Sequence, residues 1–476
     1  MATIGTAFSI ATGALDANQA ALDIVANNTA NVNTPGYTLE TPTWEANDSA
    51  SIGGLNAGMG VEMTGAQSQR DRVLDQAVQQ QTQTESGSAA RLTALNQTQA
   101  LFTGATSAGT ATSPSSGIGS DMSNFFDSLS SLEANPSQIA SRQSVLGAAG
   151  TLASDFNSAA AQLQSQRQAL DEQSTSVVSQ ANTLLNNLAQ LNVQIGAQSP
   201  NADAGTLEDQ RQQDLTNLSQ LIGIRTVPTE DNGLTVTTMG GALLVSEGQA
   251  APITTGEVSG ATHFFSAGGT DITSDLTAGG GQLGGILTAR DHDIPQVQNS
   301  LDALAYAVGS TMNQMNAQGV DLNGNAGAAI FSLPNGATAV NPAGSAAQIA
   351  VVMTDPTQIA AAAAGAGPSD NTNLVTMANE QNAGFVKGTS PTAYFSDMVT
   401  TLGSLTSEVS GENTAQQAAL TQLQSQVGSI SGVNLNDEAA ALETFEQSYQ
   451  AASKLFTTLD QVMVSALNLG VETTYS

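Results

Sequence analysis

The two ends of the chain carry the same apolar spacing, and this pattern restricts the fold more than any other feature. Apolar residues recur there at alternating steps of three and four, as in helices that pack along a narrow seam. The N-terminal seam is Ile4, Phe8, Ala11, Leu15, Asn18, Leu22 and Val25. The C-terminal seam is Leu442, Phe445, Tyr449, Ala452, Phe456, Leu459, Met463 and Ala466. Because core-facing helices usually show a wider stripe, we expect the two helices to pair as a coiled coil; separate packing on a core is the alternative.

Polar residues in and after the first seam predict where the first helix ends and what sets the register of the helix pair. Asparagine tolerates the left-handed conformation at a helix C-terminus, so the first helix is expected to stop near Asn27 and Asn28. Pro35 and Gly36 suit the centre of a type II turn. Asn18, the polar member of the seam, is predicted to fix the register of the pair.

The second seam is preceded by the signals of a helix start. Gly432 is expected to break the segment before it, and Asn434 or Asn436 to cap the new helix. Asp437 and Glu438 suit the positive end of a helix.

Between these ends, the apolar periodicity changes several times. Long helical patterns rich in Gln and Leu occupy 66–225, broken at Pro200 and Gly205 and by a predicted loop over 103–120. Short alternating runs cut by glycine follow, including "GLTVTTMGGALLVSEG" and "ATHFFSAGG". A helix returns near Gln282, with Ile286, Leu301, Leu304, Val308 and Met312 as its inner face. The strand-like "AAQIAVVM" precedes a last long helical pattern, 371–427.

The pattern predicts a fold that is mainly α with β-rich insertions, elongated and multidomain. The paired terminal helices form a core domain from 1–65 and 430–476. A helical, rod-like bundle domain comprises 66–225, 282–318 and 370–429. A β-rich insertion spans 226–281, and a second, partly β insertion spans 319–369. We expect these small β domains at the distal end, opposite the two termini.

Charge and cysteine content narrow the functional classes. The chain has 41 acidic and 10 basic residues, a formal net charge of −31, which disfavours nucleic acid and anionic membrane surfaces as partners. Without cysteine there is no disulfide scaffold and no thiolate site. No Sec-type signal peptide and no apolar run of transmembrane length are seen, so the chain is expected to be cytoplasmic or exported by another route.

Three segments resemble chemical motifs, and each has a simpler interpretation. "GGGQLGG" from Gly279 contains G-x-G-x-x-G, but no strand of a βαβ unit precedes it, so we expect a joint that enters a helix. "DLNGNAGAAIFS" from Asp321 fails as a calcium loop at its sixth and twelfth positions and predicts a turn. Asp291 and Asp293 beside His292 face different ways on a helix. We therefore predict no enzyme, no cofactor and no metal site.

Each end of the chain carries a distinctive motif. Asn27, Asn28, Ala30, Asn31 and Asn33 lead into "TPGY" (34–37) near the N-terminus, and "SGVNL" (431–435) precedes Phe445 and "YQA" (449–451) near the C-terminus. These motifs resemble the N-terminal and C-terminal signatures of the bacterial flagellar axial family of rod, hook and hook-associated proteins. The chain departs at Thr29, where Ile is usual, and at Leu39-Glu40, where Arg-Gln often follows. Three features resemble the hook-associated branch of this family. They are the long Gln/Leu helical region before the first β insertion, the stretch 280–305, and "VVMTDPTQIAAA" followed by "DNTNLVTMANEQN".

The resemblance implies a structural component of the bacterial flagellum, at the junction between hook and filament, that allows filament assembly. The implied partners are other copies of the chain in a ring or helical layer, the hook protein, a second hook-associated protein on the filament side, and an export chaperone on the C-terminal helix. The implied location is the extracellular flagellum, reached by type III export without a cleaved signal. Alternatives are another axial protein of hook or rod, and a secreted adhesin carried by the β insertions.

The same resemblance implies that the terminal helices and the asparagine loop contact neighbouring subunits. The expected interaction residues are Phe8, Leu15, Leu22, Val25, Asn28, Asn31, Asn33, Pro35, Gly36, Tyr37, Leu442, Phe445, Tyr449, Phe456, Leu459 and Met463.

Overall fold

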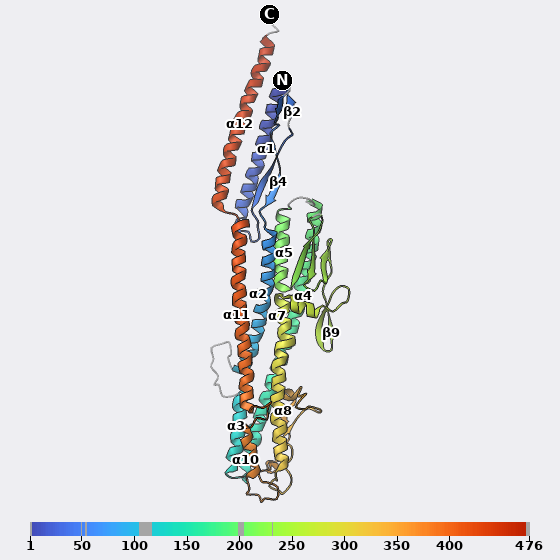
Figure 1. The fold of residues 1–476 in the computed structure, drawn as a ribbon, viewed down its shortest axis with the longest axis vertical. Helices are drawn as coiled ribbons and strands as arrows, with labels where there is room; N and C mark the ends of the chain where they lie inside the picture. Colours follow the sequence, from blue (N-terminus) through green and yellow to red (C-terminus); the bar gives the residue numbers. More distant parts are fainter. Residues whose placement is uncertain are drawn as a thin grey trace.

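The computed structural model describes residues 2–48, 50–52, 55–103, 117–198, 204–230 and 232–472. Figure 1 shows an elongated molecule with both termini at one end. Helix α1 (Ala2–Asn31) lies beside helix α12 (Leu435–Glu472) there, as the matched seams predicted. The predicted fold class, mainly helical with small antiparallel sheets, is confirmed.

Long helices form a rod below the terminal pair. Its helices are α2 (Arg72–Thr103), α3 (Ile118–Glu133), α4 (Ile139–Gln198), α5 (Thr206–Leu221), α7 (Gly281–Thr288), α8 (Ile294–Gln318), α10 (Thr372–Asn379) and α11 (Pro391–Ser431), and the short α6 (Thr273–Gly279) leads from the first insertion into α7. Helix α4 alone has 60 residues, which is about 90 Å at 1.5 Å per residue. A short π-helical turn (Ala289–Asp293) joins α7 to α8, and 3-10 turns occupy Pro356–Gln358 and Glu380–Asn382.

A continuous apolar core fills the rod. Phe125, Phe126, Phe156 and Leu163 are fully buried within it. The predicted inner face of the returning helix is confirmed, because all five of its residues are buried. Most of the predicted loop over 103–120 and the break at Pro200 lie outside the described residues; helix α3 already begins at Ile118.

The first insertion is a four-stranded antiparallel meander and a hairpin. The meander has the order β5 (Ile224–Pro228), β6 (Leu234–Thr238), β7 (Leu243–Ser246) and β8 (Gln249–Ala250), and β9 (Thr254–Val258) pairs with β10 (Ala261–Phe265). Both runs predicted as strands are strands. Helix α6 was not predicted there.

The first insertion lies beside the half of the rod nearer the termini and not at its distal end, which corrects our expectation (Figure 1). The reason is the length of α4, whose side offers a docking surface to β7 and β8. Asn182 of α4 donates to the Ile253 carbonyl (2.8 Å) and accepts from the Ile253 N–H (2.9 Å). This paired contact anchors the insertion to the helix.

The second insertion lies at the end away from the termini, as expected. It holds β11 (Phe331–Ser332), helix α9 (Ser345–Gln348) and β12 (Ala350–Val351), so the strand expected over 346–353 is only two residues long. Arg142 of α4, which is buried, donates to the carbonyls of Pro136 and Ile359, both at 2.6 Å. An arginine inside the rod thus ties this loop region to α4.

Candidate functional site

The terminal helices meet through aromatic and small residues. The rings of Phe8 and Phe456 pack edge to face, with centroids 5.1 Å apart. Ala452 is buried at the same seam. The predicted pairing is therefore present as side-chain contact, although the α12 side of the seam remains partly open.

The predicted interaction residues fall into three groups by exposure. Val25 and Asn28 are buried. The half-buried group is Phe8, Leu15, Leu22, Asn31, Tyr37, Phe445, Phe456 and Leu459. The exposed group is Asn33, Pro35, Gly36, Leu442, Tyr449 and Met463. The structure brings the first two groups into contacts within the chain and leaves the third on the surface.

A β-hairpin covers a second side of α1, which the sequence analysis missed. Strand β1 (Glu40–Ala46) pairs with β4 (Val61–Ser68), and the short β2 (Ala50–Ile52) and β3 (Leu55–Ala57) continue beyond them. A Cβ on Gly13 would lie only 3.2 Å from the Val61 carbonyl oxygen, so α1 and β4 are very close there. Trp44 of β1 also packs on Phe445 of α12, with ring centroids 6.3 Å apart. The terminal unit is therefore two helices and a hairpin.

The signal for this second side was a row of small residues. Ala17, Ala21 and Ile24 are buried although they lie outside the predicted seam. They continue the three-and-four spacing of Ile10 and Gly13, which lie close to Gly60 and to Val61 of β4, respectively. Alanine and glycine carry little hydrophobic signal, so only the α12-facing seam was recognised.

Asn28 is the centre of the terminal unit. Its side chain is 1% exposed, and its Nδ2 donates to the Glu40 carbonyl (2.9 Å) and to Oε2 of Glu438 (3.2 Å). Its Oδ1 accepts from the Tyr37 hydroxyl (2.8 Å) and the Glu40 N–H (3.1 Å). One amide therefore joins α1, the asparagine loop, β1 and α12.

Helix α1 ends at Asn31, three residues after the predicted stop. Asn28 cannot act as a cap, because its side chain bonds to Glu438 of α12. Asn31 donates to the carbonyl of Asn27 (3.0 Å), so the chain is still helical there. Asn18, which was predicted to fix the register, donates to the Ala14 carbonyl of its own helix (2.6 Å), and among the described residues its side chain has no hydrogen bond to α12. On α12, Asn434 is the cap, since its Oδ1 accepts from Asn436 N–H (3.0 Å).

Two side chains that bond to Asn28 have raised pKa values. Burial raises the pKa of Tyr37 far above its ordinary value, and the carboxylates of Glu40, Asp209 and Glu438 raise it further. Burial also raises the pKa of Glu438, although the hydrogen bond from Asn28 opposes that shift. The cluster holds Tyr37 as a neutral hydrogen-bond donor.

The "TPGY" segment forms the predicted turn. Tyr37 N–H donates to the Thr34 carbonyl (3.2 Å), and Gly36 has φ +81°, as the third position of a type II turn requires. A Cβ on Gly36 would lie 3.8 Å from Gln213 of α5, so the turn rests on the rod. The loop therefore connects the terminal unit to the rod.

A polar latch fixes this loop to the rod. The carboxylate of Asp209 on α5 accepts from the Thr38 hydroxyl (2.7 Å), the Thr38 N–H (3.1 Å) and the guanidinium of Arg70. On the opposite side, Leu39 N–H donates to the carbonyl of Ser431 at the end of α11 (2.9 Å). These contacts connect chain segments that are more than 100 residues apart, which the sequence pattern does not reveal.

The segments with a chemical motif have structural roles. The glycines after Gly279 lie where α6 passes into α7, and a Cβ on Gly285 would be 2.1 Å from the Gly87 carbonyl oxygen of α2, so they allow close helix packing. Asp321 accepts from the N–H groups of Asn323 and Asn325 (both 2.8 Å), which makes the predicted turn. Asp293 instead pairs with Arg91 of α2 (2.8 Å), a link that was not predicted. Within the described ranges, no group of three or more His, Cys, Asp or Glu is arranged to hold a metal.

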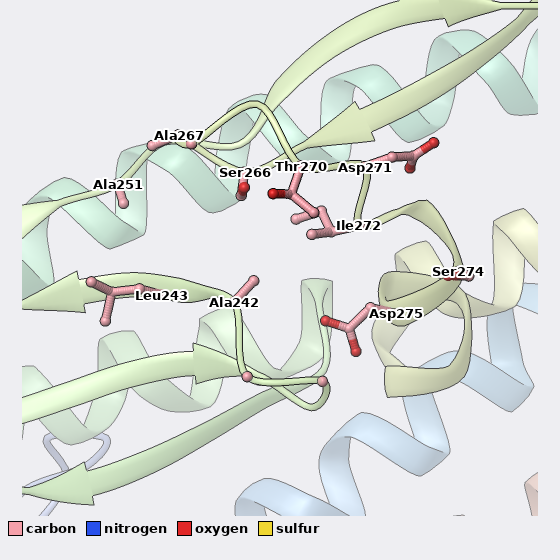
Figure 2. Close-up of a pocket in the computed structure, with 13 residues that line it drawn as sticks. Ala242, Leu243, Ala251, Ser266, Ala267, Thr270, Asp271, Ile272, Ser274 and Asp275 are labelled. Carbon is pink, nitrogen blue, oxygen red and sulfur yellow. The ribbon is translucent and has the colours of Figure 1, made fainter.

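Figure 2 shows a surface hollow of about 620 Å³ on the first insertion. Small and acidic side chains line it, including Ser266, Asp271 and Asp275. His263 pairs with Asp271 at 2.6 Å, but no hydroxyl bonded to the histidine was found in the described part of the chain. The hollow therefore shows no nucleophile and base set.

None of the described helices is both long enough and apolar enough to span a membrane.

Comparisons with known proteins agree with these features. A model of the flagellar hook-associated protein FlgK helical domain matches residues 108–331, and one of the flagella basal body rod protein matches residues 8–38. Flagellar hook-associated protein 1 of Escherichia coli (strain K12) is 26% identical, with 96% of this chain and 98% of the relative covered. Its counterpart from Bacillus subtilis (strain 168) is also 26% identical, with 96% of each covered.

A solved structure extends the comparison to the fold. The flagellar hook junction protein FlgK from Burkholderia pseudomallei aligns with a TM-score of 0.64 at 19% identity, covering 74% of this chain and 99% of that chain. The rod-protein match includes α1 and the asparagine loop, and the helical-domain match includes α3 to α8. The chain therefore belongs to the family of flagellar hook-associated protein 1, a family of structural and not catalytic flagellar components.

Proposed function

We propose that this chain is a structural subunit of the junction between flagellar hook and filament, on which the filament assembles. The observation that carries the proposal is the apolar surface left exposed along α12. Six large aliphatic residues of this helix are between 39% and 60% exposed: Leu435, Leu442, Leu455, Val462, Val464 and Leu467. Exposed apolar surface of this extent is typical of a protein interaction site.

A repeating assembly would cover this surface. In a heterologous contact, each subunit offers one face to the next and keeps a complementary face open. Burial of a leucine or valine side chain contributes on the order of 1.5–3 kcal/mol, and ordering the backbone costs a comparable amount per residue. The terminal helices, with the exposed Tyr449 and Met463, therefore gain most of their stability when neighbours arrive.

The family implies assembly with flagellar partners. We propose as partners other copies of this chain in a ring or helical layer, the hook protein, and a second hook-associated protein on the filament side. Before assembly, an export chaperone would cover α12, whose apolar side is open. The two terminal segments (1–65 and 430–476) would form the assembling core domain, and the rod and the two insertions would project from it.

Gene deletion tests the function directly. Cells that lack this chain should carry hooks without filaments and release filament protein into the medium. Normal filaments on the deletion strain would refute the junction role.

Hydrogen exchange tests the assembly mechanism separately. In a verified monomer, amides of residues 4–25 and 442–467 should exchange far faster than those of the rod core, because their neighbours are missing. Assembly should slow them. Strong protection of both segments in the monomer would exclude a terminal unit that depends on neighbours.

A further inference from the structure

We infer that Asn335–Gly336, in the second insertion, is a site of spontaneous deamidation, and that the fold protects the other two Asn-Gly pairs of the chain from it. The three pairs are Asn232–Gly233, Asn323–Gly324 and Asn335–Gly336. Asparagine is among the thermolabile residues of proteins. A following glycine exposes its backbone nitrogen most, because it has no Cβ.

The reaction is intramolecular and needs only water. The Gly336 nitrogen bonds to Cγ of Asn335 and loses its proton, and the side-chain nitrogen leaves as ammonia. Water then opens the five-membered imide at either carbonyl and gives aspartate or isoaspartate. Both products add one negative charge, and isoaspartate also routes the backbone through Cβ.

Two groups must be free for this step: the amide of the asparagine and the N–H of the following glycine. At Asn335 both are free of hydrogen bonds to any residue that the structure describes, and both residues are exposed. The turn around them is closed by Ala337 N–H and the Pro334 carbonyl (3.1 Å), so Gly336, with φ +81°, occupies its third position. The turn hydrogen bond leaves the N–H of the third residue unused.

The other two pairs place glycine one position later. Gly324 N–H donates to the Asp321 carbonyl (3.2 Å), and Gly233 N–H donates to the Glu230 carbonyl (3.1 Å). In both turns the attacking nitrogen is therefore the donor that closes the turn.

The asparagine amides of these two pairs are also held. Asn323 donates to the Thr357 hydroxyl (3.1 Å), and Asn232 donates to Oε1 of Glu208 on α5 (2.5 Å). Two hydrogen bonds must open before either site can react, whereas none must open at Asn335. Turn position, and not the Asn-Gly dipeptide alone, thus selects the site.

The surroundings of Asn335 predict little structural damage. The neighbouring Val340 is 95% exposed, so the loop carries little packing. The chain is anchored again where Asp302 accepts from Gly344 N–H (3.0 Å) and Ala346 N–H (2.8 Å). Deamidation should add charge to the end of the molecule away from the termini without unfolding it.

The test is incubation of the full-length protein at neutral and mildly alkaline pH, followed by peptide mass spectrometry. Chymotryptic cleavage after Phe331 separates Asn323 from Asn335, so each site is quantified alone. Asn335 should deamidate at least about tenfold faster than either other site. At each of those sites two hydrogen bonds must first open, and the combined net free energy of two such bonds corresponds to at least about this factor. All deamidation should accelerate with pH, since the attacking nitrogen must lose a proton.

Two controls decide the cause. In denaturant, where no turn persists, the three sites should react at comparable rates. The Asn335→Gln variant, which must form a larger ring, should lose the fast phase and keep the circular dichroism spectrum. Equal rates at the three sites in the folded chain would overturn the inference. A preference for Asn335 that persists in denaturant would overturn it as well.

Discussion

The rod and the terminal unit are both helical, but they bury their apolar residues very differently. In the rod, Phe125 and Phe126 pack edge to face at 5.4 Å and are 0% exposed. In the terminal unit, Phe8 and Phe456 make the same kind of contact at 5.1 Å while remaining half-buried. The rod therefore encloses its phenylalanines between its own helices. In the described part of the terminal unit, apolar side chains along α12 stay exposed beside α1 and the hairpin, which is the arrangement expected of a surface that meets neighbours.

The largest expected effect is on the free energy of unfolding, when one phenylalanine of each aromatic pair is replaced. Phe126→Ala should lower the free energy of unfolding by about 3–5 kcal/mol, because it leaves a cavity in a closed core. The matched variant, Phe456→Ala, removes the same side chain from a half-open site and should cost the monomer about 1 kcal/mol. Denaturant titration followed by circular dichroism measures both. Equal losses would mean that the terminal unit is as well packed as the rod.

A second substitution tests the polar centre of the terminal unit. Asn28→Ala leaves the buried Glu438 carboxylate and the half-buried Tyr37 hydroxyl without their partner, and should destabilise that unit by about 1–3 kcal/mol. Trp44, the only tryptophan, packs on Phe445, so its fluorescence reports the unit's opening. The exposed Asn33→Ala should change stability by less than about 0.5 kcal/mol. Similar behaviour of the two variants would argue against a central role for Asn28.

The rod should respond to pH at a carboxyl pair between α3 and α4. Burial and the neighbouring Asp121 raise the pKa of Asp155 from 3.8 to about 6. Because the folded state binds this proton more tightly, the rod should gain stability as pH falls from about 7 to about 5 and lose it as pH rises again; solvent screening at this half-buried group keeps the gain below about 1 kcal/mol. Chemical denaturation at a series of pH values measures this, and Asp155→Asn should flatten the profile. A gain in stability with rising pH over that window would contradict the assignment.

One substitution on α12 should barely change the stability of the monomer and yet strongly impair assembly. Leu467 is 60% exposed on α12, so Leu467→Ser should change monomer stability by less than about 0.5 kcal/mol. If neighbours cover this residue, the same variant should assemble poorly onto hooks in a complementation assay. The similarly polar change at an exposed rod position, Val193→Ser, should leave assembly intact. Normal assembly of the Leu467 variant would place the interface elsewhere.

The sequence predicted the helices well and their neighbours poorly. Matched seams paired α1 with α12 because a heptad carries enough apolar residues to mark one contact line. The hairpin on the other side of α1 was missed, since Ala17 and Ala21 give no strong pattern. The predicted stop at Asn27 and Asn28 was wrong because an asparagine that caps a helix and one that bonds to distant segments look the same in a sequence. The role of the candidate residues in subunit contacts stays a prediction.

By itself, the sequence determined the helical periodicity, the Pro35–Gly36 turn and the cap at one of two asparagines. These depend on residues within one or two turns of each other. The tertiary structure alone decided that Asn28 joins four segments, that Asp209 latches the loop to the rod, and that the first insertion docks beside α4. Such contacts connect residues far apart in the chain, and their energies depend on burial, which exists only once the helices have packed.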